Sequence, residues 1–312
     1  MPAFATHYIF LDEMKDEITR NIDFRFDVKT AGVGTQGPDI FLFHRLWPPV
    51  TIYKALFGTA SLIHREKPEK LFDGFAEYLS SCKNRDLAKS YIYGFILHYA
   101  LDRNCHPYVY AFQNQITAEN KKIHSLAAHN QVEHAVDTYL LYHRKGIYPP
   151  SLFNPDETFT NDADALGEIA SIMNFTLDKY YGKQVEKSEI KRAVTDTAKL
   201  QATLSDKKGN ATRLARILET PTGPLTGYFK LSASIKPKDL EIADKYANIR
   251  HREWISPYDN VTRTDSFEEL FEAAKADALT LIENFEKVCE GKMSGYEATG
   301  NISFLTGTEV TQ

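Results

Sequence analysis

The chain has 312 residues, of which 43% are hydrophobic, 12% aromatic and 25% charged, so it can bury a sizeable core and lacks the composition of a disordered protein. Its 37 basic and 42 acidic residues give a formal net charge of −5. This balance excludes the broadly basic surface that is typical of nucleic-acid-binding proteins. We therefore expect a folded protein that has no stable nucleic-acid partner.

The start of the chain and its cysteines indicate a reducing compartment. The first residues lack the basic region and apolar run of a secretory signal, and no stretch approaches the ~18 consecutive apolar residues of a membrane span. The cysteines are Cys82, Cys105 and Cys289, an odd number at distant positions, which argues against a disulfide framework. We predict a cytoplasmic protein without a transmembrane segment.

Apolar residues recur at helical spacing through most of the chain, and strand patterns are scarce. Glycine and proline mark the expected ends of helices, for example at Gly32, Gly34 and Pro107. Asp265 or Ser266 is expected to cap the last long helix. The helical patterns cover 52–64, 69–81, 86–104, 121–143, 162–181, 186–204, 209–218 and 266–290.

These patterns predict an all-α protein without a β domain. The helices form either one continuous domain or two layers that meet near residue 150, as 1–150 and 151–312. The polar run at 248–254 is expected to be a solvated helix face. The tail from Met293 to Gln312, rich in Gly, Ser and Thr, is expected to be irregular.

A spacing of four residues recurs among histidines and acids. His98, Asp102 and His106 follow one another at this interval, and His129 and Glu133 repeat it. On an α-helix a step of four residues advances about 40° around the axis, so such side chains share one face. Neutral imidazole and carboxylate are the ligands that zinc takes when no thiolate is offered. The spacing therefore predicts a zinc site.

A single histidine in an apolar helix is more often a hydrogen-bonded core residue than a metal ligand. Here nine of the ten histidines lie before residue 144, in the region where the interval recurs. The chain also lacks a His-Glu-x-x-His motif, a Glu-x-x-His pair, a Gly-x-Ser-x-Gly elbow and a phosphate-binding glycine loop. These absences favour a histidine-rich zinc site on helices over the other kinds of metal or hydrolase site.

The motifs around these residues resemble those of the bacterial zinc-dependent phospholipase C family, whose zinc site is related to that of the S1/P1 nucleases. The resemblance covers residues 1 to 145 and implies a multi-helix zinc-dependent phospholipase C-like bundle, with its metal-binding core in 1–150. In chain order the motifs are Ala5-Thr6-His7, Gly37-Pro38-Asp39, Leu62-Ile63-His64, His98-x3-Asp102, His106 and His129-x3-Glu133.

The resemblance implies two or three zinc ions and distributes eight residues over three positions. These are Asp39, His64, His98 and Asp102 for the first zinc, His7, Asp102 and the N-terminus for the second, and His106, His129 and Glu133 for the third. Two features depart from the family pattern. His106 lies four residues after Asp102 instead of six, and no tryptophan occurs before Trp47, whereas family members mature to an N-terminal tryptophan.

The implied reaction is hydrolysis of a phospholipid or a related phosphodiester by metal-activated water. Asp39 is the candidate that positions or deprotonates this water, and its alternative role is a helix cap after Gly-Pro. Nearby aromatic side chains would wall a lipid pocket or belong to the core, and these are Phe41, Phe43, Trp47 and Tyr53.

Two other functions use the same metal ligands. One is an S1/P1-type nuclease or phosphatase, for which aromatic platforms and a basic groove are expected. The other is a non-catalytic zinc-stabilised binding protein, for which four protein ligands on each ion are expected.

Overall fold

A computed structural model describes residues 4–47, 50–51, 54–204 and 236–311. The described part is built almost entirely from helices, which confirms the predicted all-α fold. The helices are α1 (Phe4–Arg20), α2 (Val28–Thr35), η1 (Gly37–Leu42), α3 (Phe57–Arg65), α4 (Glu69–Leu79), α5 (Arg85–Glu119), α6 (Ser125–Lys145), η3 (Pro150–Leu152), η4 (Pro155–Glu157), α7 (Ala163–Tyr181), α8 (Lys187–Leu204), α10 (Leu240–Ala247), α11 (Phe267–Cys289) and α12 (Gly295–Thr299).

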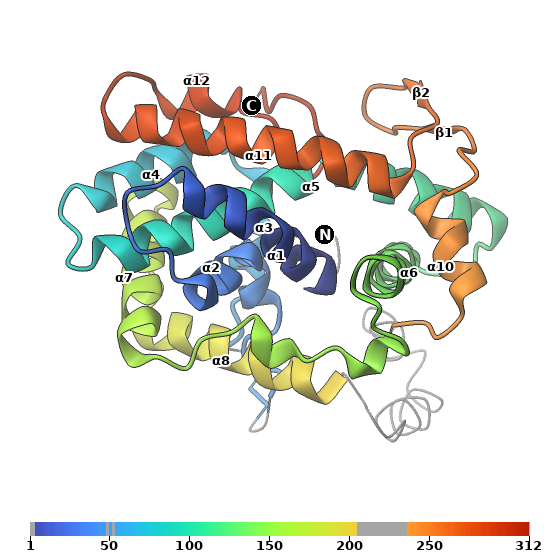
Figure 1. Ribbon diagram of the computed structural model, residues 1–312, viewed down its shortest axis with the longest axis horizontal. Helices are drawn as coiled ribbons and strands as arrows, with labels where there is room; N and C mark the ends of the chain where they lie inside the picture. Colours follow the sequence, from blue (N-terminus) through green and yellow to red (C-terminus); the bar gives the residue numbers. More distant parts are fainter. Residues whose placement is uncertain (1–3, 48–49, 52–53, 205–235, 312) are drawn as a thin grey trace.

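The long helix α5 runs through the middle of the molecule and packs against α2, α6 and α11. In Figure 1, α11 and α8 lie on opposite sides of the layer that contains α1, α2 and α5. The expected end of this helix at residue 104 is wrong, because α5 continues through Pro107 to Glu119. The proline removes one helical hydrogen bond. Burial of the side chains that follow it, among them Val109 and Phe112, offsets that loss.

Two glycines allow α2 to touch α5 backbone to backbone. A Cβ atom on Gly34 would lie 2.2 Å from the carbonyl oxygen of Tyr91, and one on Gly94 would lie 2.0 Å from that of Ala31. Gly32 and Gly34, which we expected to mark a boundary, lie inside α2. Gly32 lies against Thr158, where a Cβ atom would be 2.3 Å from the carbonyl oxygen, and Gly34 lies against α5; this close packing overcomes their low helix propensity. The contact brings the end of α2 against the polar face of α5.

The second half of the chain differs from expectation in three places. The run 248–254 is not a helix, because Asn248 ends α10 in the left-handed conformation and Trp254 is buried in strand β1. β1 (Trp254–Ile255) pairs with β2 (Thr262–Arg263) as a short antiparallel hairpin. The tail includes α12, and the predicted helix 209–218 lies outside the described residues.

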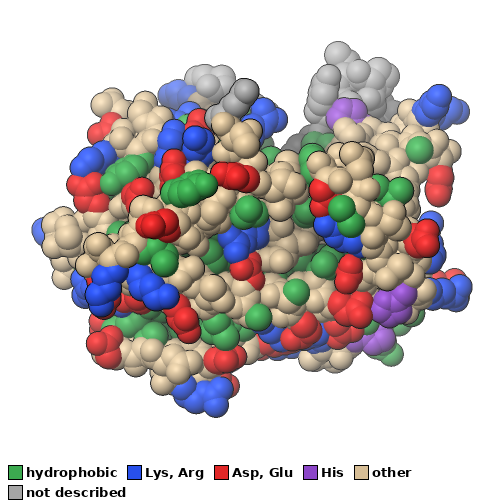
Figure 2. Space-filling view, turned by 90° about the horizontal axis from the view of Figure 1, so that it is seen from above, with side chains coloured by type: hydrophobic (Ala, Val, Ile, Leu, Met, Phe, Trp, Pro, Cys, Tyr) green, Lys and Arg blue, Asp and Glu red, His purple; other side chains and the backbone are tan. Residues whose placement is uncertain are grey.

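The last long helix begins as expected. Ser266 caps α11 by accepting from the backbone N–H of Glu269, whose carboxylate accepts in turn from the backbone N–H of Ser266. None of the described helices is long and apolar enough to cross a membrane. On the face seen in Figure 2, basic and acidic side chains are interspersed.

A buried apolar cluster contains side chains from both ends of the chain, including Phe10 of α1, Phe95 of α5, Phe271 of α11 and Phe304 near the end of the chain. The division of the chain near residue 150 stays a prediction.

Candidate metal centre

The structure brings all eight candidate ligands together in the interior. They come from five helices, with His7 on α1, Asp39 on η1, His64 on α3, His98, Asp102 and His106 on α5, and His129 and Glu133 on α6. Each of these side chains is buried. Three groups have ligand atoms within 4.8 Å of one another, and they are His7 with Asp39 and His98, His64 with His98 and Asp102, and His106 with His129 and Glu133.

The carboxylate of Asp102 lies at the centre of this arrangement. Its Oδ1 is 3.5 Å from Nε2 of His7, and its Oδ2 is 3.2 Å from Nε2 of His98 and 3.6 Å from Nε2 of His64. Nδ1 of His106 lies 3.6 Å from the same Oδ2. Neither carboxylate oxygen has a hydrogen-bond partner among the described residues, although the side chain is wholly buried. A fold that buries such a group normally supplies a compensating partner.

The spacing of these atoms fits a metal ion. Zinc binds imidazole nitrogen and carboxylate oxygen at about 2.0–2.2 Å in a tetrahedral arrangement, so two ligand atoms of one ion lie about 3.3 Å apart. The Asp102 oxygens lie 3.2–3.6 Å from Nε2 of His7, His64 and His98. These Nε2 atoms are buried and have no hydrogen-bond partner among the described residues. The donor set therefore fits zinc in both chemistry and spacing.

Backbone carbonyls orient two of the imidazole rings. Nδ1 of His64 lies 2.8 Å from the carbonyl oxygen of Ala60, one turn earlier in α3. Nδ1 of His98 lies 3.0 Å from that of Thr35, at the end of α2. Because a carbonyl only accepts, we assign the hydrogen of each neutral ring to Nδ1, which leaves Nε2 with a lone pair facing the centre.

His106 and His129 are oriented in the same way, one by a backbone carbonyl and the other by a side chain. Nδ1 of His106 lies 2.6 Å from the carbonyl oxygen of Phe304, and Nδ1 of His129 lies 3.0 Å from Oε1 of Gln113. His106 was expected at a helix end, but it lies inside α5. Phe304 was missed by the sequence reasoning. A backbone carbonyl 198 residues away leaves no pattern near His106.

Burial and neighbouring charges set the protonation of the metal-free centre. Burial alone would raise the pKa of Asp102, but His98 and His106 hold it well below its usual value. Burial lowers the pKa of His7 to about 4. Burial also raises the pKa of Asp39 to about 7. At neutral pH, Asp102 is therefore an anion and His7 is neutral, which are the forms that metal ligands need.

Asp137 fixes the position of His7. Its carboxylate accepts from the backbone N–H of Ala5 at 3.1 Å, and from the N–H and hydroxyl of Thr6 at 2.8 and 2.7 Å. These N–H groups belong to the first turn of α1, which has no internal partners for them. Asp137 continues the interval of four residues from His129 and Glu133, but nothing in the sequence relates it to the start of α1.

One edge of the centre is more open than the rest. His129 is 9% exposed, Glu133 6%, and Asp39 and His64 5% each, whereas the three candidate ligands on α5 are wholly buried. The ring of Tyr110 lies 5.0 Å from that of His129 at this edge. These four candidate ligands are therefore the least enclosed of the eight.

The other sequence expectations have mixed outcomes. Asp39 lies inside η1 and not at its start, and its Oδ1 has no hydrogen-bond partner among the described residues, so it does not act as a helix cap. Phe41 belongs to the core, while Phe43 and Trp47 are partly buried. Tyr53 and the N-terminus, which the resemblance assigns to the zinc of His7, lie outside the described residues.

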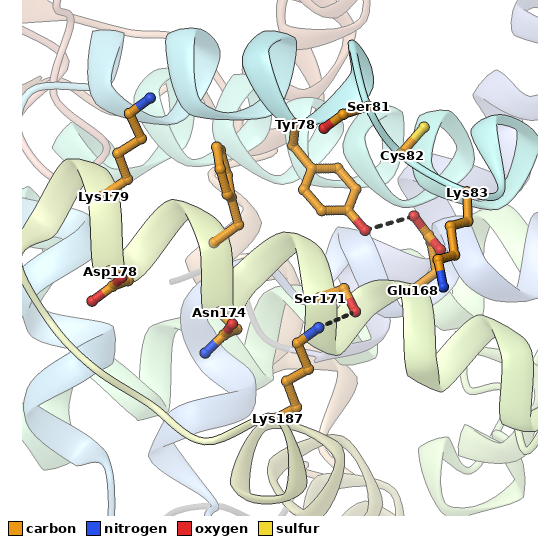
Figure 3. A pocket seen from close by; sticks show the side chains of 11 residues that line it. Tyr78, Ser81, Cys82, Lys83, Glu168, Ser171, Asn174, Asp178, Lys179 and Lys187 are labelled. Carbon is orange, nitrogen blue, oxygen red and sulfur yellow. Dashed lines mark hydrogen bonds between the residues drawn. The ribbon is translucent and has the colours of Figure 1, made fainter.

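A cavity of about 590 Å³ lies apart from these ligands, between α4 and α7 (Figure 3). Tyr78 donates to Glu168 across it at 2.8 Å, and Lys187 donates to Ser171 at 2.9 Å. Its lining includes none of the eight candidate ligands. The cavity therefore adds nothing to the metal centre.

Comparison with known proteins agrees with this geometry. A family model described as zinc-dependent phospholipase C matches residues 6–207, more than half of the chain and a span that contains all eight candidate ligands. No curated protein and no solved structure matches the chain. The chain belongs to the zinc-dependent phospholipase C family.

Proposed function

We propose that the protein is a zinc-dependent phosphoester hydrolase that cleaves a phospholipid or a related phosphodiester in the manner of a phospholipase C. The main support is the buried Asp102 carboxylate, which lies among four imidazoles without a hydrogen-bond partner among the described residues. Membership of a zinc-dependent family supports the same conclusion. A merely structural carboxylate would not leave both oxygens without donors.

We propose three metal positions. The separate group of His106, His129 and Glu133 supports one of them. Asp102 would serve the other two, because its two oxygens face different imidazoles. The remaining ligands divide between these two positions, with Asp39, His64 and His98 at one and His7 at the other.

Asp39 is our candidate for the residue that holds the attacking water. Burial raises the pKa of its carboxyl to about 7, and its Oδ1 lies 3.5 Å from Nε2 of His64. It lies on the more open edge, where substrate and water can meet it. Bound zinc lowers the pKa of a coordinated water to about 7 and neutralises charge on the phosphate oxygens. Asp39 would orient this water and accept its proton as the phosphoester bond breaks.

The experiment measures zinc and turnover on the same protein. Zinc per chain is determined by mass spectrometry after gel filtration, with two or three ions expected. Hydrolysis of phosphatidylcholine vesicles is followed by release of diacylglycerol and phosphocholine, before and after chelation and after zinc is restored. A chain that purifies and folds without zinc affinity would overturn the proposal.

Two further substrates distinguish the alternatives. Cleavage of single-stranded DNA or of nucleotide monoesters in preference to the lipid would indicate an S1/P1-type nuclease or phosphatase. Stoichiometric zinc with no cleavage of any phosphoester would indicate a zinc-stabilised binding protein. Neither alternative is favoured by a specific observation. The cytoplasmic location stays a prediction.

A further inference from the structure

The C-terminal segment 299–308 lies directly against the metal centre. The ring of Phe304 is wholly buried, with its centroid 5.4 Å from that of His64 and 6.1 Å from that of His98. Its carbonyl oxygen is the partner of Nδ1 of His106 at 2.6 Å. This segment lies outside residues 6–207, the part of the chain that the family model matches.

Specific contacts hold the segment on α5. The hydroxyl of Tyr99 donates to the carbonyl of Ile302 at 2.6 Å, and the guanidinium of Arg103 donates to that of Thr299 at 3.3 Å. Gly307, at φ +63°, lies so close to α5 that a Cβ atom there would be 2.8 Å from the carbonyl oxygen of Arg103. Segment 299–308 is therefore docked by hydrogen bonds and by close backbone packing.

Among the histidines with an oriented Nδ1, His106 is the one whose partner lies in this segment. His64 uses a carbonyl of its own helix, His98 one at the end of α2, and His129 the side chain of Gln113 on α5. These partners precede residue 120. If segment 299–308 moves away, His106 loses its carbonyl partner while the other three rings keep theirs.

We propose that segment 299–308 is a positioning element for His106. The Phe304 carbonyl keeps the hydrogen of the His106 ring on Nδ1, which leaves Nε2 free to bind zinc together with His129 and Glu133. The zinc affinity of this position therefore depends on docking of the segment. His64 and His98, at another position, contact the Phe304 ring but keep Nδ1 partners outside the segment. The inference rests on the proposed zinc binding but not on the identity of the substrate.

The test weakens docking without touching a ligand. Tyr99→Phe removes the hydroxyl that bonds Ile302, and Gly307→Ala adds a Cβ atom where α5 leaves no room. The matched control is Tyr296→Phe, because that exposed residue bonds Glu309 at 3.2 Å and both lie outside segment 299–308. Zinc affinity is measured by chelator competition, and the His106 tautomer by nitrogen NMR on metal-free protein at neutral pH.

We expect wild type and Tyr296→Phe to carry the His106 hydrogen on Nδ1. In Tyr99→Phe and Gly307→Ala the tautomers should mix, and one zinc per chain should bind about 10- to 100-fold more weakly while the others are unchanged, the usual effect of losing an outer partner. Circular dichroism checks the fold of each variant. If Gly307→Ala disturbs folding, the more conservative Tyr99→Phe decides the test.

Two results would overturn the inference. One is a wild-type His106 that carries its hydrogen on Nε2. The other is a folded Tyr99→Phe protein whose zinc affinities and tautomer match those of Tyr296→Phe. Absence of phospholipid hydrolysis would contradict the proposed function alone, because both readouts of the positioning element are made without substrate.

Discussion

Two carboxylates are buried on neighbouring helices, and only one of them accepts hydrogen bonds from the described residues. Asp137 of α6 accepts three hydrogen bonds from the start of α1, and Lys236 lies 3.2 Å from it. Asp102 of α5 is equally buried, but it faces only imidazoles and has no hydrogen bond among the described residues. Both acids follow the interval of four residues that drew attention to the site.

The difference separates structure from function. Burying a charge is costly, and a fold that needs the charge for its own stability supplies donors, as it does for Asp137. The charge on Asp102 has no donor among the described residues and is available to a bound metal ion. A buried acid without donors, surrounded by oriented imidazoles, therefore indicates a metal ligand more specifically than burial or spacing alone.

The largest expected effect is that of Asp102→Asn. Because Asp102 would serve two ions, this change should remove most of the zinc and lower hydrolysis by about 10³-fold or more, since metal ions supply several kcal/mol of transition-state stabilisation. Each occupied position adds about 4 kcal/mol of stability at a thousandfold excess of zinc over its Kd, so the variant should keep only the share of the position formed by His106, His129 and Glu133. Zinc per chain and urea unfolding with and without zinc measure both. A variant that retains full zinc would contradict the bridging role.

Asp137→Asn should have a smaller effect of a different kind. The amide nitrogen would face either N–H groups of α1 or Lys236, so we expect a loss of about 2–4 kcal/mol in the free energy of unfolding. Because Asp137 bonds the start of α1 and is not itself a proposed ligand, most of this loss should already be present in zinc-free protein. Urea unfolding of both forms measures it. A loss confined to the zinc-loaded form would break the comparison between the two acids.

The sequence predicted the candidate ligands on α5 and α6 because their signal is local. A step of four residues on one helix places His98, Asp102 and His106 on one face whatever the rest of the chain does. The all-α class followed from the same helical period. The family resemblance, which depends on the order of short motifs, then implied that His7 and His64 bind zinc together with residues on this face.

The features that the sequence did not predict depend on contacts between distant residues. The continuation of α5 through Pro107 and the helical conformation of Gly32 and Gly34 both run against local propensity and are supported by packing. The Phe304 carbonyl is a backbone group, which any residue could supply, so its identity carries no signal. Asp137 was visible as an acid, but the helix start that it serves lies 131 residues earlier.

Asp39 lies between the two extremes, and the smallest expected effect concerns the proton that it releases when zinc binds. Burial raises its pKa to about 7, and nearby Asp102 raises the pKa of His98 despite burial, so at pH 6 both groups hold a proton in metal-free protein. Zinc requires the deprotonated forms, so binding at pH 6 should release the protons held by Asp39 and His98. Asp102, with a pKa far below this range, should release none.

Asp39→Asn should reduce this release by about one proton. Below pH 7, each unit of pH should lower the zinc affinity of wild type about tenfold more than that of Asp39→Asn, because each linked proton contributes about tenfold per unit. Zinc affinity should increase with pH, because zinc competes with a proton that Asp39 loses as the pH rises through its raised pKa. Calorimetry in buffers of different ionisation enthalpy counts the protons. Equal proton release from wild type and Asp39→Asn would show that Asp39 is already ionised before zinc binds, and would place it with Asp102 as a preformed anion.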